Sequence, residues 1–93
     1  TPVTVTLKGE VGTIAAANGE YSIYVPATAE SGKDVTIEIT VEKAPSVNTT
    51  IELNDGSTPV FTKNIGAGEL EGQTLTVHIT APAANTTYTL SAS

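Results

Sequence analysis

The sequence predicts an all-β protein, built as a sandwich of two antiparallel sheets. Two observations support this prediction: several short segments alternate strictly between apolar and polar residues, and turns containing Gly or Pro separate them. The composition agrees, because seventeen Thr and sixteen Val or Ile are branched at Cβ and suit a pleated surface. No segment has a helical period, so a sheet with one apolar face must be covered by a second sheet.

The clearest strand spans residues 34–42. Its odd-numbered residues are apolar and its even-numbered residues from Thr36 to Glu42 are polar, which is typical of a strand buried on one face. Segments 3–8 and 73–80 follow the same rule. The apolar rows of the three segments are Val35, Ile37, Ile39 and Val41, then Val3, Val5 and Leu7, then Leu75, Val77 and Ile79.

We expect seven strands in all. Their ranges are 3–8, 20–26, 34–42, 48–54, 58–65, 73–80 and 86–92. The turn at 54–57 contains Asp-Gly and predicts a hairpin, because these residues readily adopt positive φ angles. Pro59 lacks an N–H group, which favours an edge position for the strand that contains it. Segment 9–19 is ambiguous, since it could be a loop or hold a short extra strand at 12–16.

Charge and length restrict the function. Residues 1–93 suffice for one domain, and four Lys, no Arg and ten acidic residues give a net charge of −6. Such a chain has too few cations to bind nucleic acid and is repelled by anionic membranes. The absence of Cys excludes disulfides and thiolate sites, and no apolar run is long enough for a membrane span or signal peptide. The chain begins at Thr1 without Met, so we expect a module excised from a larger protein.

From Gly32 onward the order of features resembles bacterial immunoglobulin-like and fibronectin type III-like modules. The matching segments are GKDVTIEITVE, IELNDGS, AGELEGQTLTVHITAP and NTTYTLSAS, the last of which is similar to the closing strand of CARDB-type adhesion repeats. This resemblance implies a seven-stranded antiparallel immunoglobulin-like β-sandwich in a surface protein or secreted enzyme. It implies spacer or interaction roles and transfers no functional residue.

Few residues are candidates for chemistry. His78 is the single histidine, and the alternation places it on the polar side of its strand with no nucleophile or carboxylate indicated beside it. The glycine-rich segment 66–72 leads into a strand and contains Glu69 and Glu71, so a loop is favoured over a phosphate cradle. We therefore predict no catalytic, cofactor-binding or metal-binding residue, and no enzyme activity.

Weaker candidates concern surface ligands. Calcium could bind acidic clusters at Glu52, Asn54 and Asp55 or at Glu69 and Glu71, although the spacing of a calcium-binding loop is absent. Tyr21 and Tyr24 fall on opposite faces of their strand, and we expect Tyr24 to be the exposed ring that a glycan could use. Lys8 and Lys63 are expected to point outward, which argues against a buried Lys–Asn crosslink.

Two Asn-x-Thr sequons, which are acceptors for N-glycosylation, begin at Asn48 and Asn85, both at junctions between a turn and a strand. The sequence leaves open whether they are used, as it leaves open the binding of Ca²⁺ to the acidic loops. It also leaves open the parent protein.

These observations favour a non-catalytic structural, spacer or adhesion-stalk module of a bacterial extracellular or cell-surface protein. The alternatives are a glycan- or protein-binding accessory module of a secreted carbohydrate-active enzyme and a virion decoration domain. We expect a monomer without a cofactor, whose partners are the neighbouring domains of the parent chain and, in the alternative, a glycan or protein ligand.

Overall fold

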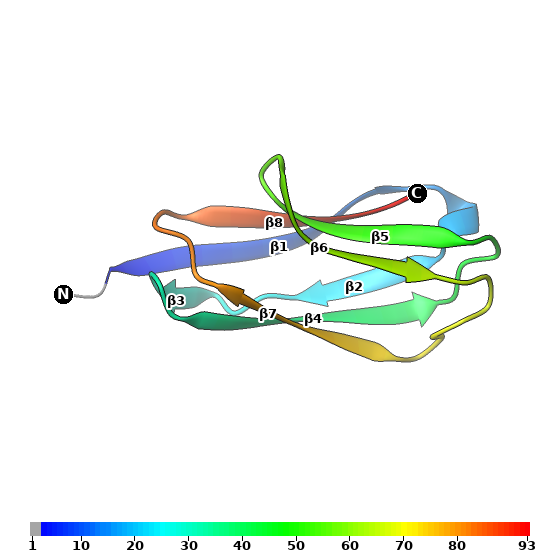
Figure 1. Ribbon diagram of the computed structural model, residues 1–93, viewed down its shortest axis with the longest axis horizontal. Coiled ribbons are helices and arrows are strands. Elements are labelled where there is room, and N and C mark those ends of the chain that lie inside the picture. The colour runs from blue at the N-terminus through cyan, green and yellow to red at the C-terminus, as the bar shows by residue number, and fades with distance from the viewer. Residues whose placement is uncertain (1–2) are drawn as a thin grey trace.

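The computed structural model describes residues 3–93, which form eight strands and one short 3₁₀ helix (Figure 1). The strands are β1 (Thr4–Ile14), β2 (Glu20–Tyr24), β3 (Thr28–Glu30), β4 (Asp34–Lys43), β5 (Thr49–Asp55), β6 (Thr58–Ile65), β7 (Thr74–Thr80) and β8 (Thr86–Ala92), and the helix is η1 (Ala16–Asn18). The expectation of an all-β chain is confirmed.

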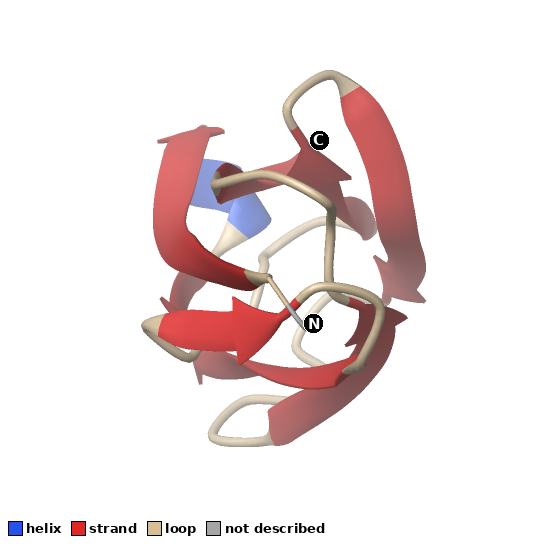
Figure 2. Cartoon of the chain, turned by 90° about the vertical axis from the view of Figure 1, so that its left-hand side faces the viewer, coloured by secondary structure: helices blue, strands red, loops and turns tan. Residues whose placement is uncertain are grey.

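The strands form two sheets that face each other, as the view along the long axis shows (Figure 2). The larger sheet has the order β3-β1-β8-β5-β6 and the smaller sheet has the order β2-β4-β7. The sandwich arrangement is therefore as expected. The strand number and the directions differ from the expectation, because there are eight strands instead of seven and β1 runs parallel to β8.

The parallel pair arises because β1 continues well past its predicted end at residue 8. Its first residues pair antiparallel with β3, and from Leu7 onward it pairs parallel with β8, with a register shift between Val11 and Ile14. Gly9 and Gly12 allow this continuation. A Cβ at Gly9 would collide with Val25, and one at Gly12 would lie 3.1 Å from the Leu90 carbonyl oxygen. These glycines serve close packing of an extended chain where a loop was the competing interpretation.

The eighth strand is β3, which lies between the predicted strands 20–26 and 34–42, where no strand was expected. Pro26 has no N–H group to donate to a sheet, and β2 ends before it at Tyr24. After Pro26 the chain passes from the small sheet to the large one, where β3 begins. The Leu7 amide donates a hydrogen bond to the Ala27 carbonyl at 2.8 Å, which ties this crossing to β1.

The core lies between the two sheets and contains most of the predicted apolar rows, with Val3 as the exception, because it is 58 % exposed before the start of β1. Side chains of β1, β4, β5 and β8 supply most of it, and all four apolar residues of the β4 row are at most 3 % exposed. The buried apolar residues are Val5, Leu7, Tyr21, Val35, Ile37, Ile39, Val41, Ile51, Leu53, Ile65, Val77, Ala81, Tyr88, Leu90 and Ala92. One polar side chain, Thr49, is buried among them, and its hydroxyl donates to the Val47 carbonyl and accepts from Asn18 Nδ2.

The predicted hairpin and edge strand are both confirmed. Strands β5 and β6 pair antiparallel across the Asp-Gly turn, where Gly56 has a φ of 62°. Strand β6 pairs with β5 alone and ends the larger sheet, as Pro59 indicated. Most of its side chains are exposed; Ile65 is buried in the core, and the partly buried Phe61 packs against it.

The molecule is elongated, with principal extents of 47, 22 and 16 Å. Strand β1 starts at one end of the long axis and runs toward the other, and β8 runs in the same direction (Figure 1). The first described strand therefore begins at one end, and the last strand finishes toward the opposite end.

Candidate functional site

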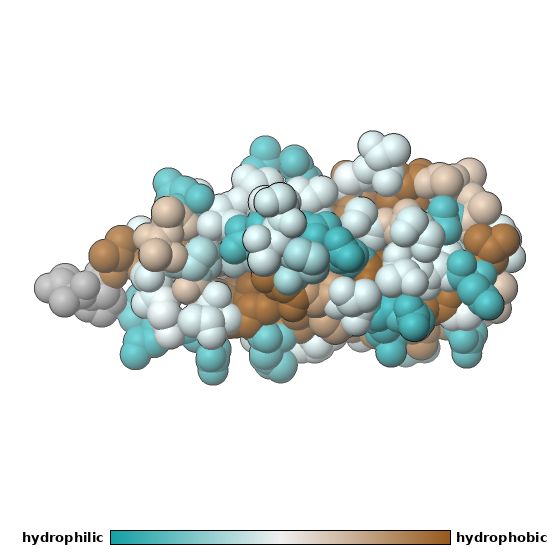
Figure 3. Space-filling model, turned by 45° about the horizontal axis from the view of Figure 1, so that its top comes forward, coloured by the Kyte–Doolittle hydropathy of each residue, from teal (hydrophilic) through white to brown (hydrophobic). Residues whose placement is uncertain are grey.

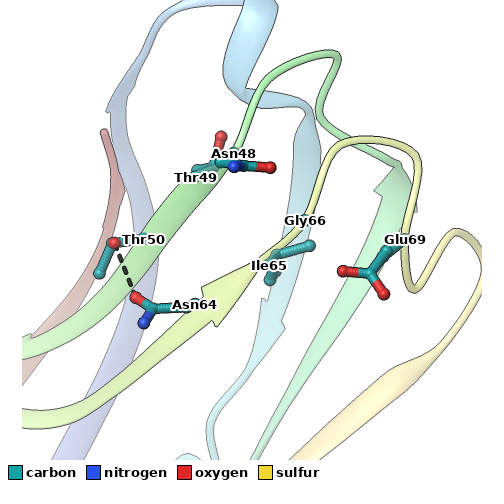
Figure 4. A pocket seen from close by; sticks show the side chains of 7 residues that line it. All are labelled: Asn48, Thr49, Thr50, Asn64, Ile65, Gly66 and Glu69. Atoms are coloured by element: carbon teal, nitrogen blue, oxygen red, sulfur yellow. Dashed lines mark hydrogen bonds between the residues drawn. The ribbon is translucent and has the colours of Figure 1, made fainter.

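A polar pocket of about 550 Å³ lies where β5 begins and β6 ends (Figure 4). The loop after β6 closes one side of it. Its lining residues are Asn48, Thr49, Thr50, Asn64, Ile65, Gly66 and Glu69. Because three separate segments contribute, the sequence offered no sign of this grouping beyond the polar character of its members.

Hydrogen bonds hold several of the polar groups in place. The Thr50 hydroxyl donates to Asn64 Oδ1 at 2.8 Å, and the Ala67 amide donates to Asn48 Oδ1 at 3.2 Å. The Glu69 carboxylate lies against Gly66, where any larger side chain would collide with it. The pocket thus presents amide, hydroxyl and carboxylate groups suited to hydrogen bonding with a polar ligand such as a sugar, and it contains no aromatic ring on which a sugar could stack.

The acidic residues considered for calcium do not converge on one point. Glu69 lines the pocket, while the Glu71 carboxylate accepts a hydrogen bond from the Ala44 amide at 3.3 Å. Near the hairpin, Asn54 Nδ2 donates to Ser91 Oγ at 3.4 Å, so this amide faces β8. Within residues 3–93 no three His, Cys, Asp or Glu side chains lie close enough together to hold a metal ion.

The glycine-rich segment 66–72 is a loop between β6 and β7, as predicted. Its amides donate to the protein's own carbonyl groups: Gly68 to Pro45, Glu69 to Gly66, and Gly72 to Val41. Gly68 and Gly72 have φ angles of 75° and 76°, so the glycines serve these turns. A phosphate cradle requires amides that point at a ligand, and these amides point at the protein.

His78 lies on the outer face of β7, exposed, as the alternation predicted. Its Nδ1 lies 3.3 Å from the Thr36 hydroxyl, across the β4–β7 pair. Farther along the same face, beyond the Glu38–Thr76 pair, the hydroxyl oxygens of Thr40 and Thr74 lie 3.1 Å apart. His78 is therefore part of a row of polar cross-strand contacts on this sheet.

The tyrosines divide as expected. Tyr24 is 62 % exposed at the end of β2, whereas Tyr21 is buried and its hydroxyl donates to the Asn18 carbonyl at 2.6 Å. Burial raises the pKa of Tyr21 above its usual value. It also raises the pKa of Tyr88, with a further contribution from the negative charge of Asp55. Tyr24 is thus the ring available to a ligand.

The exposed apolar side chains are dispersed. They belong to different elements and loops, and the face shown in Figure 3 carries apolar patches separated by polar and neutral surface. The larger ones are Val3, Val11, Tyr24, Val47 and Val60. Lys8 and Lys63 are exposed as predicted, and Lys8 Nζ lies 3.9 Å from a carboxylate oxygen of Glu10.

The two sequon asparagines are exposed in end loops, Asn48 between β4 and β5 and Asn85 between β7 and β8. No helix in the described part of the chain is long and apolar enough to cross a membrane.

Comparison with known proteins gives no relative: no family model, no curated protein and no solved structure matches the chain.

Proposed function

We propose that the chain is an immunoglobulin-like, non-catalytic spacer or adhesion-stalk module of an extracellular or cell-surface protein. The main support is the direction of the terminal strands. Because β1 and β8 are parallel in a body 47 Å long, the chain enters near one end and leaves toward the other. Domains joined before β1 and after β8 would follow one another along an axis, as a stalk requires.

The immunoglobulin-like assignment rests on two supports. The first is the resemblance of the segments after Gly32 to such modules. The second is the topology: two sheets face each other, and neighbouring strands of the larger sheet are far apart in sequence, such as β1 beside β8 and β5 beside β8. We also propose that the module is bacterial and monomeric. The bacterial origin rests on the resemblance, and the monomeric state rests on the mutual repulsion between copies that each carry a net charge of −6.

A replacement in the parent protein tests the spacer role. We expect an unrelated β-sandwich of similar length, inserted in place of residues 1–93, to leave surface display and ligand binding of the parent unchanged. A parent that is displayed at the same level but no longer binds its target would show that this module is itself the recognition domain.

A tandem protein tests the geometry. In a chain of two copies joined from Ser93 to Thr1, the second β1 would continue away from the first body. Small-angle X-ray scattering should therefore give a maximum dimension near twice the 47 Å of one body. A tandem protein little longer than the single copy would contradict an end-to-end arrangement, and the single copy measured alongside is the control.

The alternative is a ligand-binding accessory module, and the pocket of Asn48, Asn64 and Glu69 favours it. If a glycan binds there, chemical-shift changes in a titration should centre on these residues. Glu69→Ala should then abolish the shifts, whereas Tyr24→Ala should not.

A further inference from the structure

The two sequons share a structural arrangement that the spacer role does not require. In each, the carboxamide oxygen of the asparagine accepts a hydrogen bond from a backbone amide distant in sequence. The Thr6 amide donates to Asn85 Oδ1 at 2.7 Å, and the Ala67 amide donates to Asn48 Oδ1 at 3.2 Å. Asn85 thereby fixes its loop to β1, and Asn48 fixes its loop to the one that follows β6.

These bonds determine which atom of each side chain is free. A backbone N–H group can only donate, so the carboxamide must turn its oxygen toward it and its nitrogen away. Both asparagines are exposed, and within residues 3–93 neither Nδ2 donates a hydrogen bond to a protein group. Nδ2 is the atom to which an N-linked glycan is attached.

Of the three asparagines outside sequons, Asn18 and Asn54 show the opposite arrangement. Asn18 Nδ2 donates to the Thr49 hydroxyl at 2.9 Å, and Asn54 Nδ2 donates to Ser91 Oγ at 3.4 Å. Both side chains are partly buried. The third, Asn64, resembles the sequon asparagines: its side chain is exposed, its Oδ1 accepts from the Thr50 hydroxyl, and within residues 3–93 its Nδ2 donates to no protein group. Both sequon asparagines therefore have a free nitrogen, and the sequence motif distinguishes them from Asn64.

We propose that Asn48 and Asn85 are N-glycosylation sites, one in an end loop after β4 and one in an end loop after β7. An oligosaccharyltransferase would form a C–N bond from Nδ2 to the anomeric carbon of a lipid-linked oligosaccharide. The C–O bond to the lipid pyrophosphate breaks, the pyrophosphate leaves with the electron pair, and Nδ2 loses one proton. Each Oδ1 keeps its hydrogen bond, so the fold accommodates both glycans.

The proposal rests on the extracellular part of the proposed function, because the transferase acts on exported chains. It also changes the role of the pocket. Asn48 forms one wall of that pocket, so a glycan on Asn48 would stand beside Glu69 and Asn64 and obstruct a free ligand.

The first experiment uses the parent protein purified from its source, with the cell-surface and intracellular fractions kept apart. Peptide mapping by mass spectrometry, before and after enzymatic release of N-glycans, should find Asn48 and Asn85 occupied in the surface fraction. Surface protein that is bare at either asparagine overturns the proposal for that site and leaves the spacer role intact. Protein found only inside the cell overturns both.

The second experiment separates the structural argument from the motif. In a glycosylating secretory host, the secreted wild-type chain should carry two glycans, and Asn48→Asp and Asn85→Asp, which keep the accepting oxygen, should each carry one. Thr87→Ser keeps the second sequon and should still carry two.

The control Glu20→Thr creates a new sequon at Asn18, whose Nδ2 already donates a hydrogen bond to the Thr49 hydroxyl. The secreted, folded fraction of this variant should be bare at Asn18. A folded Glu20→Thr protein with a glycan at Asn18 and an unchanged melting temperature would show that glycosylation does not require a free Nδ2. That result would overturn the structural basis of the proposal.

Discussion

Strands β4 and β6 obey the same backbone geometry but have opposite environments. Strand β4 lies between β2 and β7, and its apolar row faces the other sheet, fully covered. Strand β6 is paired on one side only, and its apolar residues Val60 and Phe61 are adjacent instead of alternating. Val60 is 37 % exposed, whereas Val35 on β4 is 3 % exposed. The difference indicates that stability is concentrated in the strand with neighbours on three sides.

Removing a large side chain from β4 should produce the largest effect. Ile37 is fully buried, so Ile37→Ala loses its burial and leaves a cavity that the surrounding strands fill only in part. We expect a loss of about 3 kcal/mol in the free energy of unfolding, measured by urea denaturation, against about 1 kcal/mol for the control Ile37→Val. A loss under about 1 kcal/mol for the alanine variant would mean that the core can close around the gap.

The same substitution in both strands tests the comparison directly. Val→Thr nearly preserves the shape of the side chain and replaces one methyl group with a hydroxyl, which costs free energy where no water or hydrogen-bond partner is available. Val35→Thr should therefore lower the free energy of unfolding by about 2 kcal/mol. Val60→Thr, at the exposed edge, should change it by less than about 0.5 kcal/mol. Equal losses at the two positions would show that β6 is as well covered as β4.

Alkaline pH should destabilise the buried region in particular, with a smaller effect on the free energy of unfolding than the substitutions above. Burial raises the pKa of Tyr21 and Tyr88 in the folded chain, so the unfolded chain loses these protons first. Stability should be constant below pH 10 with respect to these groups and should fall as pH rises above it, because the folded state then binds more protons than the unfolded state. Thermal unfolding of Tyr88→Phe, measured between pH 8 and 11 beside the wild type, should show a shallower fall in stability, and an equally steep fall would contradict this prediction.

Much of the fold follows from local pattern. The bounds of β4, β5, β7 and β8 agree with prediction to within one residue at each end, because one covered face imposes a period of two on the sequence. The exposure of Tyr24 and His78 follows from the same rule. These features require no knowledge of which strands are neighbours.

What the sequence does not predict depends on distant contacts. Gly9 and Gly12 are needed because β8 and Val25 approach β1 closely, and a glycine in isolation indicates a loop equally well. A period of two is also the same in parallel and antiparallel strands, so the direction of β1 beside β8 has no local signal. The pocket was missed for the same reason, since Asn48 and Glu69 meet only after folding.

The parallel pairing of β1 and β8 has a mechanical consequence. Tension between the two chain ends would pull β1 toward one end of the body and β8 toward the other, so that these neighbouring strands slide along each other. The pairs from Leu7–Thr86 to Val11–Leu90 lie across that direction. Their hydrogen bonds would bear the load together and would have to break together, whereas strands peeled apart from one end lose their bonds singly. A stalk subjected to flow would have its resistance to rupture in this single ladder.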